Sequence, residues 1–412
     1  MKQKPKIIIF LYNRFFDPLI QSNFWLYIKD YLEHENNPYQ FHLITYENTE
    51  FPLTEEQHQL VLQWKNQGLE WSSLTWHQGT GLKYKLIDLL NGFKLVTQLR
   101  LKGYNHIITL GSVAGTYAYT YSFPLRLRLF LYQFEPHSEY AIDNKMWSEE
   151  SPQYKISHFL EKRAAKFAKV IASGTIFMQE RVQEVWHSNA EFFRIPTVAN
   201  DVKFIFNEQD RIKTRKKLGI SEDKWVLYYP GKFGDLYYRE AFAWMYKWLK
   251  EEEPRLHLLI VTPHTDEEVK ALFDDAAVST TDYTIAHSDY ADIHNYAFAS
   301  DFAIISVPPG PSKKFISNIK VGEYLCAGLP FLITRGVSED YIYAEEQGVG
   351  VVVDDFVEVD IKKAWPEIKA YLMKDPEELR KHCREVGLGY RGFDNLNKKF
   401  KAAIASLTSK NN

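Results

Sequence analysis

The chain has 412 residues, of which 45% are hydrophobic and 25% charged, and its formal net charge is −3 at pH 7. This length exceeds what one hydrophobic core usually fills, so we expect two domains. The weak net charge gives no reason to expect nucleic-acid binding, and no apolar run is long enough to cross a membrane. The two cysteines, Cys326 and Cys383, suggest neither a disulfide framework nor a metal site, so we expect a cytoplasmic protein.

Short apolar runs recur along the first half of the chain, separated by helix-length segments. Runs without polar alternation are typical of strands that are buried on both faces of a parallel sheet. The pattern therefore predicts a doubly wound α/β domain over residues 1–197. Its expected strands are Ile7–Leu11, Phe41–Thr45, Leu74–His77, His106–Leu110, Leu129–Phe134 and Val170–Ser173.

A basic and aromatic segment lies inside this first domain, between residues 80 and 130. Against its many lysines and arginines it has a single acidic residue, Asp88. Aromatic residues interleave with the basic ones, as in YTYSFPLRLRLFLYQF. Such a surface suits peripheral contact with anionic lipids at the inner face of a membrane. The alternative is that the basic side chains simply face solvent.

The strand pattern pauses at Arg194–Asp201 (RIPTVAND), which is typical of a linker, and then resumes. It predicts a second doubly wound domain over residues 198–385. We expect residues 386–412 to form a C-terminal helix that packs back toward the N-terminal domain. The expected strands of the second domain are Val226–Tyr229, Leu258–Thr262, Phe302–Val307, Phe331–Thr334 and Val349–Val353.

The segment Pro308–Gly336 is the most informative part of the chain, because a Pro/Gly loop leads from a strand into a short helix. Ser317, Lys320 and Glu323 are spaced by three, so on a helix they form one polar stripe. Free N–H groups at a helix start and a lysine suit a phosphate, and a carboxylate can bind the two hydroxyls of a ribose. The stripe predicts half of a nucleotide-diphosphate site. The alternative is an amphipathic helix with a solvated polar face.

Five segments, in this order, resemble motifs of the family-4-type, retaining glycosyltransferases of GT-B fold. They are FEPHSEYA, FRIPTVANDVKFIF, VLYYPGKFG, IAHSDYADIHNYAFASDFAIISVPPG and SNIKVGEYLCAGLPFLITRG. The resemblance implies two Rossmann-like domains facing across a cleft, with the acceptor on the N-terminal side and the nucleotide sugar on the C-terminal side.

The resemblance also implies the activity. The protein would move a sugar from a nucleotide-diphosphate sugar, with UDP or GDP as the nucleotide, to a glycan, lipid-linked or small-molecule acceptor in polysaccharide biosynthesis. The transfer would proceed with retention, without a metal ion and without a further cofactor.

The matching positions carry the family's roles. Glu323 would hold the ribose, while Lys320, Ser317, Lys232 and Arg239 would hold the diphosphate. The loop that contains Tyr290 and Ala291 would receive the base. Gly310, Pro311 and Ser312 would pass beside the donor sugar. His137 would be the catalytic residue of the first domain, although a histidine so close to Glu135 is as often structural.

One position departs from the family pattern. Many members carry a sugar-binding glutamate eight residues before the ribose glutamate, and Phe315 occupies that position here. A catalytically silent scaffold that binds a nucleotide sugar therefore stays an alternative to the enzyme. A nucleotide-sugar epimerase is a further alternative, although the paired acid and base residues that it needs are not evident.

Overall fold

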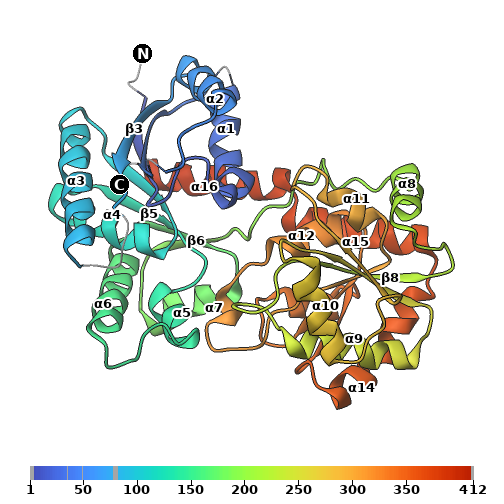
Figure 1. Ribbon diagram of the computed structural model, residues 1–412. Coiled ribbons are helices and arrows are strands. Elements are labelled where there is room, and N and C mark those ends of the chain that lie inside the picture. The colour runs from blue at the N-terminus through green and yellow to red at the C-terminus, as the bar shows by residue number, and fades with distance from the viewer. Residues whose placement is uncertain (1–3, 35, 49, 78–81, 410–412) are drawn as a thin grey trace. The chain divides into compact units, whose positions relative to one another are not determined.

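The computed structural model describes residues 4–34, 36–48, 50–77 and 82–409, which form two compact units (Figure 1). The first unit is built from the chain up to Pro196 and from Leu396 onward, and the second is built from Thr197–Asn395. Each unit contains one parallel sheet with helices on both faces. The predicted fold class of two doubly wound, Rossmann-like domains is therefore confirmed.

The sheet of the first unit has seven strands in the order β3-β2-β1-β4-β5-β6-β7. All pairings are parallel, and β1 lies between β2 and β4. The strand order changes direction at the β1/β4 pair, which is where ligands usually bind in such sheets. The strands are β1 Lys6–Phe10, β2 Gln40–Glu47, β3 Glu70–Thr75, β4 His106–Leu110, β5 Arg128–Tyr132, β6 Val170–Ser173 and β7 Glu191–Arg194.

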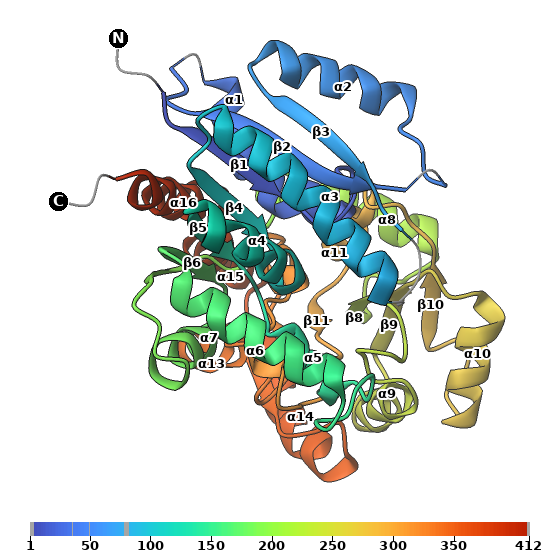
Figure 2. The same cartoon turned by 90° about the vertical axis from the view of Figure 1, so that its left-hand side faces the viewer.

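Helices α3, α4 and α6 lie along one face of this sheet (Figure 2). The core beneath them is rich in aromatic residues, and Phe10 contacts the rings of Tyr46 and Tyr121 at 6.0 and 5.4 Å. The helices of this unit are α1 Trp25–Glu33, α2 Glu55–Asn66, α3 Leu82–Leu101, α4 Ser112–Leu125, α5 His137–Asp143, α6 Pro152–Phe167 and α7 Ile176–Glu180, with π-helical turns at Ile20–Phe24 and Arg181–Val185.

The end of the chain completes the core of the first unit. Helix α16 (Phe393–Thr408) places the ring of Phe400 4.6 Å from that of Tyr27, in a stacked arrangement, and 5.9 Å from that of Phe130. Lys401 pairs with Asp30 at 2.6 Å. The terminal helix is thus an integral layer of this unit.

The second unit repeats the same topology with six strands in the order β10-β9-β8-β11-β12-β13. Its direction changes at the β8/β11 pair. The strands are β8 Trp225–Pro230, β9 Leu256–Val261, β10 Tyr283–Ala286, β11 Phe302–Ile304, β12 Phe331–Thr334 and β13 Gly350–Val353. The helices are α8 Glu208–Leu218, α9 Glu240–Glu252, α10 Asp266–Asp275, α11 Ile293–Phe298, α12 Ile319–Cys326, α13 Asp340–Glu346, α14 Glu358–Leu372 and α15 Pro376–Arg391, with a 3-10 turn at Lys313–Phe315.

The structure corrects two expected elements and adds two strands. Strand β3 spans Glu70–Thr75 rather than Leu74–His77, and the strands β7 and β10 were not predicted. The single helix expected over residues 386–412 is instead divided between the end of α15 and the whole of α16, with Gly392 between them. Among the described helices, none combines the length and the apolar character needed to cross a bilayer.

Candidate active site

The switch point of the second unit brings two chain segments together at the carboxyl ends of β8 and β11. Strand β8 ends at Pro230, so Gly231 is the first residue beyond it, and β11 ends at Ile304. The segment after β11 leads into α12, which starts at Ile319. A ligand in an open α/β sheet usually binds at this kind of position.

Helix α12 carries a buried carboxylate toward the loop before α11. Glu323 is only 7% exposed, and its Oε1 accepts a hydrogen bond of 3.0 Å from the hydroxyl of Tyr290. Burial raises the pKa of Glu323 to about 7, although the Tyr290 hydrogen bond and the charges of Lys320 and Lys203 act to lower it. The carboxylate can therefore exchange a proton near neutral pH.

Lys320, one turn earlier on α12, places its ammonium group beside the turn after β8. The Nζ atom lies 4.3 Å from the ring centre of Tyr237 and 5.5 Å from that of Tyr229. A Cβ atom on Gly231 would lie 2.6 Å from Nζ, so only glycine leaves room for the ammonium group. Burial lowers the pKa of Lys320 to about 8, and the charge of Glu323 acts in the opposite direction. A cation and a carboxylate thus occupy the same helix at the switch point.

Lys203 is a third charged group at this site, and the sequence did not single it out. Its ammonium group donates a hydrogen bond to the backbone carbonyl of Tyr290 and lies 4.1 Å from the centre of the Tyr290 ring. Lys203 lies 120 positions before Glu323 in the sequence. No local pattern connects residues so far apart, so only the tertiary fold reveals their proximity.

Ser317 lies outside α12, whose N-cap is Asn318. Its hydroxyl accepts hydrogen bonds from the backbone N–H of Thr197, at 3.0 Å, and from the guanidinium group of Arg391, at 2.8 Å. The expected stripe of three residues on one helix is therefore reduced to Lys320 and Glu323. A role of Ser317 in binding a diphosphate stays a prediction.

Lys232 and Arg239 have exposed side chains at the two ends of the turn between β8 and α9. The carbonyl of Lys232 accepts a hydrogen bond from the Tyr229 hydroxyl, and Arg239 approaches Glu240 at 3.5 Å. Ala291 is exposed and directly follows Tyr290. The predicted roles of these residues are untested by the geometry.

The predicted sugar loop is a tight turn. The N–H of Lys313 donates to the carbonyl of Gly310 at 3.0 Å, Pro311 is exposed and Ser312 is fully buried. Phe315 follows in a 3-10 turn and is only 1% exposed. The position where a sugar-binding glutamate was expected thus holds a core residue.

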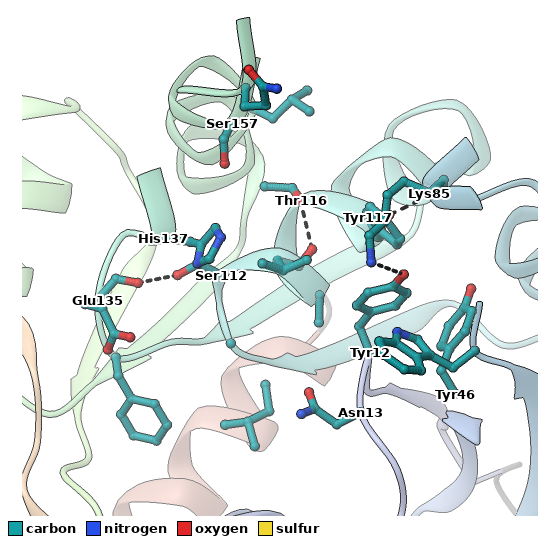
Figure 3. A pocket seen from close by; sticks show the side chains of 18 of the residues that line it. Tyr12, Asn13, Tyr46, Lys85, Ser112, Thr116, Tyr117, Glu135, His137 and Ser157 are labelled. Carbon is teal, nitrogen blue, oxygen red and sulfur yellow. Dashed lines mark hydrogen bonds between the residues drawn. The ribbon is translucent and has the colours of Figure 1, made fainter. Parts of the chain in front are cut away.

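The first unit contains a cavity of about 1400 Å³ at its own switch point (Figure 3). Two groups of residues line it. Tyr12, Asn13 and Arg14 follow β1, and Gly111, Ser112, Val113, Ala114 and Thr116 follow β4. Figure 3 shows Tyr12, Tyr46, Lys85 and Tyr117 gathered on one side, with Ser112, Glu135 and His137 on the other. Both units therefore place polar side chains where their sheets change direction.

A polar cluster stands behind the aromatic side of this cavity. The hydroxyl of Tyr12 donates to Asp88 at 2.5 Å and accepts a hydrogen bond of 3.1 Å from Lys85. The second carboxylate oxygen of Asp88 lies 2.5 Å from Nδ1 of His77. Burial, followed by the hydrogen bond to Asp88, raises the pKa of Tyr12, so its hydroxyl stays protonated. The sequence did not predict this cluster, although the isolation of Asp88 among basic residues is a signal that could have indicated it.

His137 is the first residue of α5 and lines the cavity. Its ring meets that of Trp147 edge-on at 5.2 Å, and burial lowers the pKa of the imidazole. The next residue, Ser138, is anchored to the buried Glu161 on α6 through its N–H, at 3.1 Å, and its hydroxyl, at 2.5 Å. Glu161 thus holds the start of α5 in place, and the imidazole is neutral around neutral pH.

The histidines, cysteines and acidic residues that the structure describes form no group of three that could hold a metal ion.

The fold is that of the GT-B glycosyltransferases. The chain is similar to sucrose-phosphate synthase from Thermosynechococcus elongatus, with a TM-score of 0.69 and 14% identity over 98% of this chain and 99% of that one. It is similar to HepE from Anabaena in complex with UDP, with a TM-score of 0.68 and 12% identity over 98% and 100%. It also resembles WaaG, a glycosyltransferase involved in lipopolysaccharide biosynthesis, with a TM-score of 0.63 and 14% identity over 98% and 100%. No family model and no curated protein sequence matches the chain.

Proposed function

We propose that the protein is a glycosyltransferase that takes its sugar from a nucleotide-diphosphate sugar. The observation that carries this proposal is the pairing of Glu323 and Lys320 on α12 at the switch point of the second unit. The carboxylate suits the two hydroxyls of a ribose, and the ammonium group beside Gly231 suits a diphosphate. HepE has been crystallised with UDP and with UDP-glucose, which supports UDP as a first ligand to test, with GDP as the second.

In this reaction the bond between the anomeric carbon and the diphosphate oxygen breaks, and a bond from that carbon to an acceptor hydroxyl oxygen forms. The hydroxyl proton passes to the departing diphosphate, and retention requires attack on the face that the diphosphate leaves. Lys320, together with the predicted ligands Lys232 and Arg239, would stabilise the growing negative charge without a metal ion. His137 is the proposed catalytic residue of the first unit.

The acceptor is proposed to bind the cavity of the first unit. Its aromatic walls, which include Tyr12, Trp76 and Trp147, suit the faces of sugar rings in a glycan or lipid-linked acceptor. The basic region 80–130 would bring the protein to anionic lipids as a peripheral contact. The role of WaaG in lipopolysaccharide biosynthesis supports an acceptor of this kind.

Calorimetry with UDP, GDP and ADP tests the nucleotide site directly. We expect one of them to bind the wild-type protein, and Glu323→Ala to weaken that binding by roughly tenfold or more, because a charge-assisted hydrogen bond is worth about 1.5–3 kcal/mol. Absence of binding by all three nucleotides would refute the proposal. Binding without turnover of any nucleotide sugar would instead favour the silent scaffold. The buried Phe315 agrees with that alternative, because it replaces the expected sugar-binding glutamate.

A further inference from the structure

The loop before α11 is held at two points, and both involve Tyr290. Its hydroxyl donates to Oε1 of Glu323 at 3.0 Å, and its carbonyl accepts a hydrogen bond from the ammonium group of Lys203. The same ammonium group lies 4.1 Å from the centre of the Tyr290 ring. One lysine therefore contacts both the backbone and the aromatic ring of this residue.

The Tyr290 ring is held in place and is also accessible. The residue is 48% exposed, although it contacts a buried carboxylate at one end and a lysine on its ring. An aromatic ring that is fixed and partly exposed is a suitable platform for a nucleobase, because every base presents a π face. The ammonium group of Lys203 is attracted to the face of the Tyr290 ring, which helps to hold the ring in place.

Lys203 comes from the start of the second unit and is half-buried. Burial lowers the pKa of its ammonium group, and the charges of Glu323 and Asp292 act to raise it. Glu323 and Asp292 are thus both near enough to interact with this ammonium group. Removing it would change the electrostatic surroundings of Glu323 as well as the support of Tyr290.

We propose that Lys203 is a positioning residue of the nucleotide site, which holds Tyr290 as a platform for the nucleobase and supplies positive charge beside the ribose-binding Glu323. This inference rests on the proposed function, because it assigns Lys203 to the nucleoside end of that same site. It is distinct from Lys320, which lies at the diphosphate end beside Gly231.

The charged and titratable groups around Glu323 determine how this proposal appears in a pH profile. Glu323 is faced by Lys320 and Tyr324 on its own helix, by Tyr290, by Lys203 and by Tyr228 of β8. Cys326 lies on the same helix, and Asp292 faces Lys203. Burial raises the pKa values of all three tyrosines, so they stay neutral around pH 7. Glu323, with a pKa of about 7, and Lys320, with a pKa of about 8, change charge in this range.

Nucleotide binding should consequently have a maximum between about pH 7 and pH 8, the pKa values of Glu323 and Lys320. Below this window Glu323 gains a proton, and above it Lys320 loses one. The two values belong to an interacting pair, so they are apparent midpoints. Because Lys203 lowers the pKa of Glu323, its removal should move the acidic midpoint to higher pH and leave the basic midpoint in place.

The test measures binding of UDP and GDP by calorimetry between pH 5.5 and 9 (about 3.5 pH units, to cover both midpoints). It compares the wild type with Lys203→Met, Lys203→Arg and the control Lys362→Met, which removes the same charge from α14, where Lys362 pairs with Glu358 at 2.7 Å. We expect Lys203→Met to weaken binding by roughly tenfold, as loss of one charge-assisted hydrogen bond predicts, and to raise the acidic midpoint. Lys203→Arg should restore both properties, and Lys362→Met should change neither.

Inorganic pyrophosphate separates the two ends of the site. Lys203→Met should leave its binding unchanged, because pyrophosphate has no nucleoside to contact Tyr290. Wild-type affinity and an unmoved acidic midpoint in Lys203→Met would overturn the assignment of Lys203 and leave the proposed function standing. An equal loss of pyrophosphate and nucleotide binding would also overturn it, since Lys203 would then act on the diphosphate. If the wild-type protein binds no nucleotide, the proposed function fails, and this inference fails with it.

Discussion

Gly231 is the residue on which the position of the Lys320 ammonium group depends. A Cβ atom there would lie 2.6 Å from Nζ of Lys320 and 3.0 Å from the hydroxyl of Tyr229, which are both closer than ordinary contact. Lysine has a long and flexible side chain, so it would move away rather than unfold the loop. The small residue therefore affects binding more than stability.

We predict that Gly231→Ala weakens nucleotide binding by roughly tenfold and changes the melting temperature by only a few degrees, the shift that about 1 kcal/mol causes. Calorimetry and thermal denaturation measure the two effects. Gly389→Ala is a matched control, because a Cβ at this position on α15 would meet no atom within 4 Å among the described residues outside the adjacent backbone of the helix. Equal affinities of the wild type and Gly231→Ala would show that Lys320 does not bind the nucleotide.

Glu161 is the buried acid that fixes the start of α5 beside His137. Burial raises its pKa to about 7 from the ordinary value of 4.5, although its hydrogen bonds from Ser138 act to lower it. An acid with a raised pKa in the folded state favours folding while it is protonated. Its contribution is complete below pH 4.5 and is lost as the pH rises from 4.5 through about 7.

Glu161→Gln keeps the size of the side chain and an acceptor oxygen for Ser138, but it cannot ionise. We expect it to gain stability over the wild type as the pH rises through this window, by up to about 3 kcal/mol, since each unit of pKa shift corresponds to 1.36 kcal/mol. Chemical denaturation at pH 5 and pH 8 (about one to two units outside the midpoint) compares the two proteins. If the free energies of unfolding of Glu161→Gln and the wild type differ by the same amount at pH 5 and at pH 8, the raised pKa of Glu161 is contradicted.

At the scale of elements, the strands that the sequence missed or displaced lie at the edges of the sheets. Strands β3, β7 and β10 are edge strands, whereas the fully buried strands in the centre of each sheet were predicted near their observed positions. An edge strand has fewer neighbours, so it carries polar residues, as in EWSSLT of β3 and EFFR of β7. Apolar runs reveal only strands that are buried on both faces.

The candidate site shows the same limit. Spacing along the sequence was enough to place Lys320 and Glu323 on one helix, because both lie within two turns. It could not place Ser317, because the helix begins two residues later, nor Lys203, because its neighbours come from distant segments. Contacts made through the tertiary fold leave no periodic signal in the chain.

The exposed charged residues of helices α3, α4 and α6 are all basic, and Lys155 of α6 pairs with Glu150 just before that helix at 3.0 Å. The two carboxylates that these helices carry, Asp88 and Glu161, are buried. Exposed apolar side chains lie among the cations, including Leu86 and Leu90 on α3 and Phe159 on α6. Cations that surround exposed apolar side chains suit an anionic lipid surface, because charge attracts the helix and apolar groups insert. Helix α6 extends this face beyond the basic region recognised in the sequence.

We predict that the protein sediments with vesicles that contain phosphatidylglycerol and less with vesicles of phosphatidylcholine alone. Leu86→Glu combined with Leu90→Glu should abolish most of this binding, since each lost insertion removes up to about 2 kcal/mol and each new charge is repelled. Leu62→Glu on α2 is the control, because Leu62 and Leu86 are both 52% exposed. Equal sedimentation with both lipids, or equal loss in the control, would count against lipid contact by this face.

At the scale of the whole molecule, the chain passes between its two units twice, after Pro196 and after Asn395. Within the second unit, Arg391 links the segment that follows the first crossing to the helix that precedes the second crossing. Its guanidinium group donates to the carbonyl of Thr197, at 3.1 Å, and to the hydroxyl of Ser317, at 2.8 Å, and it pairs with Asp340. Arg391 and Asp340 are both fully buried. The side chain of Arg391, at the end of α15, therefore connects the start of the second unit, the loop before α12 and Asp340.

Removing one partner of the Arg391–Asp340 pair should lower the free energy of unfolding much more than replacing both partners. Arg391→Met would leave the Asp340 carboxylate buried without its cation, and we expect it to lower the stability of the second unit by about 3–5 kcal/mol. Asp340 Oδ2 and Arg391 Nε have no hydrogen-bond partner among the described residues, so the pair is not fully satisfied. Combining Arg391→Met with Asp340→Asn should therefore recover most of the lost stability, because the Asp340 carboxylate that would be buried without its cation is removed as well.

The double variant separates stability from binding. It should unfold near the wild-type temperature, yet it lacks the guanidinium group that holds Ser317 before α12. We expect nucleotide binding to stay several-fold weaker, because Lys320 and Glu323 then lie on a helix whose start is held less firmly. A loss of about 1 kcal/mol in binding free energy corresponds to a change of this size. Thermal denaturation and calorimetry on the wild type, the single variant and the double variant give both quantities. If stability and affinity recover together, Arg391 supports the second unit only, and the loop before α12 is held in place by its other contacts.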